Sequence, residues 1–193
     1  QEAADSLRSK AYARVVDLVC EGEIEGLVQG LQSVFLDDTP IQNADGSYNF
    51  SGVTLESRPG TQQQGYIPGF ASVENEVSVG VECKFAQPVV RAITDPDVDA
   101  VRLKVSMPAL TLQDTTNGDL NGTSVSYAID LQSAGAGFVQ VLTDTVSGKT
   151  TSRYQRSYYV PLSGTGPWDV RLRRLTEDAT QSSLQNKTFL DSY

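Results

Sequence analysis

The chain has 193 residues, of which 39% are hydrophobic, and it carries a formal net charge of −9 with no histidine. This length allows one large or two small domains, and the acidic balance argues against nucleic acid or an anionic membrane surface as the main partner. The absence of histidine removes the commonest general base and the commonest metal ligand.

No apolar run approaches the 18 residues of a membrane-spanning helix, and the polar, acidic start does not have the pattern of a signal peptide. Because the first residue is glutamine rather than methionine, we expect this chain to be a piece of a longer protein.

The first 88 residues have short apolar runs that are only weakly self-contained. Residues 1–14 predict an amphipathic helical lead anchored by Leu7, and residues 15–28 predict two strands joined by a turn at Gly22. Further strands are expected over residues 33–41, 53–58 and 73–85, with a Gly/Gln/Pro-rich loop over residues 59–70. We interpret residues 1–88 as strands of another domain whose partners are missing.

Alternation of apolar and polar residues is cleanest between residues 89 and 176. The pattern predicts strands over residues 89–93, 100–107, 110–112, 124–131, 138–144, 154–162 and 168–175. In the last of these, Trp168, Val170 and Leu172 point to the core, and Gly166-Pro167 before it indicates a hairpin with residues 154–162. Many short strands separated by turn signals predict a mainly β chain, with an antiparallel immunoglobulin-like or jelly-roll-like sandwich over residues 89–176. Residues 177–193 are then an exit segment.

Three groups of residues have some features of ligand or metal sites. Asp95, Asp97 and Asp99 alternate like the start of a calcium loop, but Ala100 and Ser106 stand where that loop needs glycine and glutamate. The loop containing Asp114, Asn117, Asp119 and Asn121 is more typical of a plain turn. Gly148-Lys149-Thr150 ends like a phosphate-binding loop but lacks the upstream glycine and the following helix. We therefore expect no metal and no cofactor.

Other polar groups favour structure or contact over catalysis. Glu21, Glu23 and Glu25 lie on a predicted strand-turn-strand segment in solvent, so no general acid–base pair is indicated and an enzyme is not expected. A strip made of Arg171, Arg173 and Arg174 would either pair with acidic residues on neighbouring strands or contact an acidic neighbouring subunit.

Aromatic and thiol side chains also leave two interpretations open. The tyrosines Tyr154, Tyr158 and Tyr159 would either cover a sandwich face or form a carbohydrate platform. Cys20 and Cys83 are expected to be reduced core thiols, because their apolar surroundings suit free thiols. A disulfide between them is the alternative, whose geometry the sequence alone cannot supply.

Six motifs, in order and spread over nearly the whole chain, carry a family resemblance. They are EGEIEGLVQGLQSVFL (residues 21–36), TP (39–40), SGVT (51–54), GKTTSRY (148–154), RLRRLT (171–176) and LQNKT (184–188). With these motifs the chain resembles the N-terminal region of the tail tip attachment, or host-specificity, proteins J of lambda-like long-tailed bacteriophages.

The resemblance implies a structural virion protein at the tail tip. It implies a homotrimeric hub in the full-length protein, contacts with other tail tip and tape-measure proteins, and assembly in the host cytoplasm. It also implies that the outer-membrane receptor is met only through a distant C-terminal part. Residues 1–88 would then be partial hub strands, with the sandwich as an inserted domain. The alternative function is a carbohydrate-binding sandwich that helps adhesion.

Overall fold

The computed structural model describes residues 2–67, 69–70 and 74–193. These residues form two compact units. The sandwich unit consists of residues 2–11 together with Asn75–Tyr193, and the intervening unit is Tyr12–Glu74. Within the described residues, no helix has the length and apolar character needed to cross a membrane.

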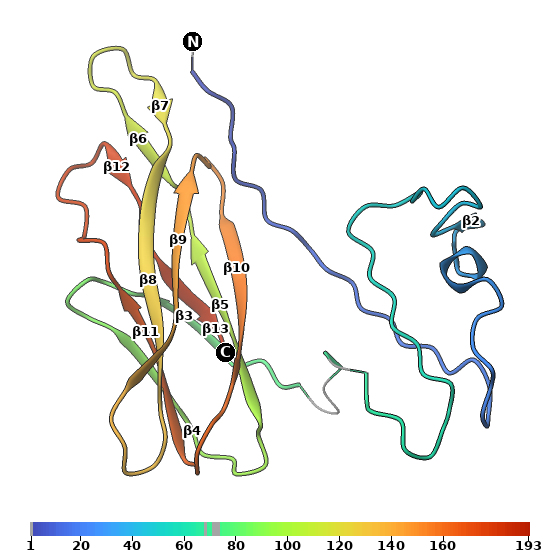
Figure 1. The fold of residues 1–193 in the computed structure, drawn as a ribbon. Helices are drawn as coiled ribbons and strands as arrows, with labels where there is room; N and C mark the ends of the chain where they lie inside the picture. Colours follow the sequence, from blue (N-terminus) through green and yellow to red (C-terminus); the bar gives the residue numbers. More distant parts are fainter. Residues whose placement is uncertain (1, 68, 71–73) are drawn as a thin grey trace. The chain divides into compact units, whose positions relative to one another are not determined.

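The sandwich unit is built from two four-stranded antiparallel sheets (Figure 1). One sheet has the order β10-β5-β13-β3 and the other has the order β4-β11-β8-β9. The strands of the first sheet are β3 (Ser78–Glu82), β5 (Ala100–Met107), β10 (Tyr154–Pro161) and β13 (Phe189–Ser192). Those of the second are β4 (Val89–Ile93), β8 (Thr123–Gln132), β9 (Val139–Gly148) and β11 (Trp168–Arg174). The predicted mainly β, antiparallel sandwich is confirmed.

A hydrophobic core lies between the two sheets, because alternate residues of each strand point inward. Leu103 and Val105 of β5 are fully buried, as are Ile129 of β8 and Leu172 of β11. Trp168 is 6% exposed and donates its indole N–H to the carbonyl oxygen of Ser163 at 2.9 Å.

Gly166 has to be glycine because of the Trp168 ring. A Cβ at Gly166 would come within 2.5 Å of that ring, so the turn before β11 reaches its close position only without a side chain. The glycine of the Gly-Pro turn is thus needed to leave room for the ring of the core tryptophan.

The sandwich is larger than the predicted range of residues 89–176. Strand β13 lies between β5 and β3, so residues from both flanks complete the first sheet. Leu190 of β13 is 1% exposed and belongs to the core. Residues 177–193 therefore return to the sheet instead of leaving the domain, and part of residues 1–88 belongs to it too. The short runs in these flanks gave too little alternation to reveal this.

The predicted hairpin between residues 154–162 and 168–175 is wrong. Strand β10 pairs with β5, whereas β11 lies between β4 and β8 in the other sheet. The Gly-Pro turn carries the chain from one sheet to the other. Both strands alternate because each has one buried face, and alternation does not reveal which sheet buries it. In contrast, β8 and β9 form an antiparallel hairpin around the predicted Gly135–Gly137 turn.

A small three-stranded sheet adjoins the sandwich. Its order is β12-β6-β7, with β6 (Thr111–Gln113), β7 (Leu120–Asn121) and β12 (Leu184–Gln185). The β6–β7 connection is the polar tip that the Asn/Gly-rich sequence predicts, and it is closed by the bond from the Asp114 N–H to the Asp119 carbonyl oxygen.

The intervening unit contains little regular structure. It has one 3-10 turn, η1 (Gly30–Ser33), and a short hairpin of β1 (Phe35–Leu36) with β2 (Thr39–Pro40). Residues 15–28 and 53–58 form no strands, contrary to the prediction, because no neighbouring strand pairs with them in the part of the chain that is described. The predicted strand over residues 73–85 forms only as β3, and its first residue, Val73, lies outside the described residues.

The N-terminal lead is extended rather than helical. Its side-chain and backbone groups form hydrogen bonds with residues 149–155 instead of with one another. Tertiary contacts therefore override the helical pattern of the first residues.

Candidate functional site

Strands β9 and β10 carry a linked group of polar side chains on their inner faces. Asp144 of β9 accepts hydrogen bonds from the hydroxyl of Tyr158 at 2.5 Å and from the guanidinium of Arg156 at 2.6 Å. Tyr158 shares a second hydrogen bond with the fully buried Tyr127 at 2.5 Å, and Arg156 donates to the hydroxyl of Tyr154 at 2.8 Å. These side chains satisfy one another where the two sheets meet.

Burial dominates the electrostatics of this group. It raises the pKa of Tyr127 to about 12 and raises the pKa of Tyr158, whose proton is also held by Asp144. Burial would raise the pKa of Asp144 too, but hydrogen bonds from Tyr158 and Arg156 and the charge of Arg156 outweigh it and lower that pKa. Two protonated phenols with an ionised carboxylate form a stable network, with no group poised to exchange a proton near neutrality.

A second cluster lies on the outer face of the β4-β11-β8-β9 sheet. Asp130 of β8 is 1% exposed and accepts a hydrogen bond from Arg171 at 2.8 Å and bonds from Arg173 at 3.1 and 3.2 Å. The Arg171 guanidinium also stacks on Phe138, 4.0 Å from the ring centroid. Burial alone would raise the pKa of Asp130, but the two arginines lower it.

The predicted arginine strip is thus divided by the structure. Arg171 and Arg173 lie on the outer face, where they already have an internal carboxylate partner. Arg174 is the next residue along the strand, so its side chain points to the opposite face, and it is 2% exposed. Arg174 therefore lies outside any exposed strip.

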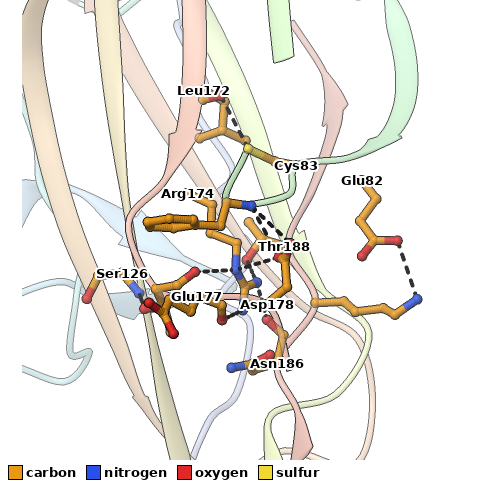
Figure 2. Close-up of polar contacts among 12 residues, drawn as sticks. Glu82, Cys83, Ser126, Leu172, Arg174, Glu177, Asp178, Asn186 and Thr188 are labelled. Carbon is orange, nitrogen blue, oxygen red and sulfur yellow. Dashed lines mark hydrogen bonds and ion pairs between the residues drawn. The ribbon is translucent and has the colours of Figure 1, made fainter. Parts of the chain in front are cut away.

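Arg174 organises the segment that leads back to the sandwich (Figure 2). Its guanidinium donates to the carbonyl oxygens of Thr176, Glu177 and Asn186 and to the Thr188 hydroxyl, and it pairs with Asp178 at 3.4 Å. Burial lowers the pKa of Arg174. A buried arginine with this many acceptors fixes the path of residues 176–188 between β11 and β13.

A polar hollow of about 270 Å³ lies beside Arg174 and is lined mainly by residues 178–187. The guanidinium nitrogens of Arg174 are already bonded to the protein, as the dashed lines in Figure 2 show. The other cation of the lining, Lys187, pairs with Glu82 at 3.3 Å, so we assign the hollow a structural role.

The metal and phosphate motifs do not assemble into sites. Among the described residues, no group of three or more Asp, Glu, Cys or His side chains could hold a metal ion. The Asp95 carboxylate accepts the Asp97 N–H and the Asp114 carboxylate accepts the Thr116 N–H, as in ordinary polar turns. Lys149 is 5% exposed and faces the N-terminal segment.

The remaining candidates are dispersed. Glu21, Glu23 and Glu25 are all exposed in the intervening unit. Of the three tyrosines, Tyr154 is buried, Tyr158 is half-buried in the Asp144 network, and only Tyr159 is well exposed, with Arg102 over its ring. The three do not form a shared platform. Cys83 is buried as expected, but Cys20 is exposed, and both are free thiols.

Sequence reasoning missed Asp130 and Asp144 as centres of ion-pair clusters. A signal existed for Asp130, because it interrupts the apolar run from Tyr127 to Leu131 in a strand that is otherwise core. A charged residue in such a run is rarely buried without a partner. No sequence pattern indicated which strand would provide that partner.

Comparison with known proteins places this sandwich in a family. The profile described as "Tip attachment protein J, FNIII-A domain" matches residues 73–193. The tip attachment protein J of Escherichia phage SECphi4 is 43% identical over 192 residues, covering 96% of this chain and 17% of that protein. The protein of the same name from Escherichia phage SECphi27 is 38% identical over 197 residues, covering 100% of this chain and 16% of that protein. The chain thus spans about one sixth of the length of these relatives.

Solved structures give only distant likenesses. The receptor binding domain of the spike protein P1 from bacteriophage PM2 is 13% identical with a TM-score of 0.33, covering 61% of this chain and 91% of that one. A protein from Sulfurospirillum deleyianum is 11% identical with a TM-score of 0.35, covering 63% of this chain and 98% of that one. At these scores neither structure bears on the function of this chain.

Proposed function

The chain belongs to the tip attachment protein J family of bacteriophage tail tips, and from that premise we propose that it is a structural module of the tail-tip hub. It would join the tail to the distal, receptor-binding part of the full-length protein. The observation that carries the proposal is that the charged side chains in the clusters of the sandwich bind one another and not an open site. Asp130, Asp144 and Arg174 each engage partners within the sandwich unit.

This arrangement suits a scaffold better than an active site. Catalytic groups need a free face toward a substrate and a pKa near the operating pH. Here the perturbed groups are held in their stable protonation states by internal partners, as in the pair formed by Asp144 and Tyr158. We therefore propose no enzymatic activity for this part of the protein.

The intervening unit supports a role in assembly. Its start is extended and apolar, yet Val15 is 76% exposed, Leu18 86% and Val19 80%. A strand-like segment with β-branched residues gains stability when it pairs with a neighbouring strand and buries such side chains. We propose that residues 12–28 complete a sheet formed by other parts of the full-length protein in the hub.

The partners follow from the same proposal. The full-length protein would be a homotrimer that contacts other tail tip and tape-measure proteins, and it would be assembled in the host cytoplasm. Contact with the bacterial outer-membrane receptor would come only from the distal C-terminal part. A net charge of −9 opposes both nucleic-acid binding and self-association at low salt, so sedimentation of this chain alone should show mainly monomer.

A peptide tag inserted at Asn117-Gly118, in the exposed β6–β7 connection, tests the proposal. We expect electron microscopy of assembled tails with a labelled antibody to place the tag where the tail tube meets the tip. Label at the far, receptor-contacting end would contradict the hub assignment. A matched insertion at Gly135-Ala136, in the exposed β8–β9 turn, should give label at the same level of the tail.

A further inference from the structure

The first residues of the chain are bound along a corner of the sandwich. Residues 2–9, which we call the latch, lie against residues 148–155, which we call the seat (Figure 1). The seat is the crossing from β9 to β10, where the chain passes from one sheet to the other. The family profile begins at residue 73, so the latch lies outside the matched domain.

Three backbone N–H groups of the seat depend on latch side chains for their acceptors. The Lys149 N–H donates to the Ser6 hydroxyl at 2.9 Å, and the Thr151 N–H donates to the Asp5 carboxylate at 2.9 Å. Further along, the Gln155 N–H donates to the Ser9 hydroxyl at 2.9 Å. Acceptors spaced over residues 5–9 thus match donors spaced over residues 149–155.

The seat also binds the latch backbone and its charge. The Lys149 carbonyl oxygen accepts the N–H groups of Ser6 and Leu7, each at 3.0 Å. The Lys149 ammonium group, on a side chain that is 6% exposed, donates to the Glu2 carboxylate and the Ala3 carbonyl oxygen. A buried ammonium group is costly unless it is paired, so the latch supplies what Lys149 requires.

Packing makes the fit specific. Leu7 packs against the hydrophobic core of the sandwich. Gly148 has φ of +145°, and a Cβ there would come 2.7 Å from the Ser6 hydroxyl oxygen and 2.8 Å from a Leu7 side-chain carbon. The glycine that begins the Gly-Lys-Thr motif is thus what allows the latch to approach closely.

We propose that the seat is a peptide-recognition site whose occupant is the chain's own latch, and that the latch docks and releases as one cooperative unit. Its recognition elements are the Asp5 carboxylate, the Ser6 and Ser9 hydroxyls and the Leu7 side chain. This assigns the Gly-Lys-Thr motif to binding the protein's own N-terminal segment and makes the latch part of the sandwich domain. The inference does not depend on the proposed role in the tail.

Residue-resolved hydrogen exchange on the whole chain tests the proposal. The reporters are the Lys149, Thr151 and Gln155 amides. The internal control is the Thr150 amide between them, which donates to the Leu110 carbonyl oxygen and not to the latch. The variants are Asp5→Ala and Ser9→Ala, and the control variant is Lys10→Ala, just beyond the latch.

A cooperative latch predicts that each single variant speeds exchange at all three reporters, by roughly tenfold or more for Asp5→Ala, while Thr150 stays protected. Lys10→Ala should change none of them. Faster exchange only at Thr151 in Asp5→Ala, or at none of the reporters, would overturn the proposal. If Thr150 also becomes fast in Asp5→Ala, the sandwich itself has opened, and the smaller change Ser9→Ala decides by the same criterion.

Discussion

The two units of the chain use similar apolar residues in different ways. The sandwich unit buries Leu103, Val105 and Leu172 completely between two sheets. In the intervening unit, Ile41 alone is buried among the described residues, while Val28 is 95% exposed. The difference lies in pairing, since every long strand of the sandwich has a neighbour to hydrogen-bond with.

From this contrast we infer that the sandwich unit folds on its own and propose that the intervening unit needs a partner. Ordering a backbone costs about 1–2 kcal/mol per residue, and burial of apolar surface has to offset that cost. The sandwich unit has the burial to do so. The intervening unit contains a small hairpin, but most of its apolar side chains are exposed. We propose that these side chains become buried when the full-length protein assembles.

The largest expected effect separates the two units most clearly. Trp168→Ala removes a ring that fills the sandwich core and should lower the free energy of unfolding by about 3–5 kcal/mol. Tyr12→Ala removes an aromatic ring that is 80% exposed and should stay within about 0.5 kcal/mol of the parent. Urea denaturation followed by circular dichroism measures both variants. Similar losses in the two would show that the units do not differ as described.

The next effect concerns the buried carboxylate on the outer face. Asp130→Ala leaves Arg171 and Arg173 without their partner and should cost about 1–3 kcal/mol. Arg171→Ala keeps the Arg173 bond and should cost about 1 kcal/mol. Asp17→Ala, an exposed carboxylate of the intervening unit, is the matched control and should be nearly neutral. If the Asp130 variant were as stable as the Asp17 variant, the ion pairs of Asp130 would contribute nothing measurable to the stability of the sandwich.

Acid should weaken the sandwich. The folded pKa values of Asp130 and Asp144 lie below the ordinary 3.8, so their contribution to stability is present above that pH. It is lost as the pH falls below 3.8 through the folded pKa values. Urea midpoints should therefore stay level from neutral pH to about pH 5 and then fall. In Asp130→Asn the urea midpoint should fall less steeply with decreasing pH. An unchanged slope would show that protonation of Asp130 does not cause the loss of stability.

The smallest expected effect is in the apolar start of the intervening unit. Leu18→Ser changes a side chain that is 86% exposed and should alter the stability of this chain by no more than about 0.5 kcal/mol. The same change in the full-length protein should reduce assembly, because there the side chain would be buried. Counting assembled tails by electron microscopy checks the second half of this prediction, and a normal yield would argue against a pairing role.

Local features of the sandwich were readable from the sequence. Strands β4 and β5 form over the predicted residues because alternation with turn signals at both ends is a local property. The inward set Trp168, Val170 and Leu172 followed from the same period-2 pattern and is buried. Gly135 and Gly137 correctly marked the β8–β9 turn.

Long-range features were not readable. Strand β10 pairs with β5 along the whole length of β5. Strand β13 lies between β5 and β3, although it is more than 80 residues from β5 along the chain. The candidate clusters show the same limit, because Asp130 meets Arg171 only after the sheet has formed. The sequence could not show that the latch is extended rather than helical. The N–H groups that bind its side-chain acceptors belong to the seat, which is far away along the chain.

Hydrogen exchange over residues 12–28, compared between this chain alone and the full-length protein in assembled tails, tests the central claim most directly. We expect near-unprotected exchange in the isolated chain, beside strong protection in β5, β8 and β11. In assembled tails, residues 12–28 should become protected to a similar degree as those strands. Equally fast exchange of residues 12–28 in both states would contradict the view that this segment awaits a partner in the tail tip.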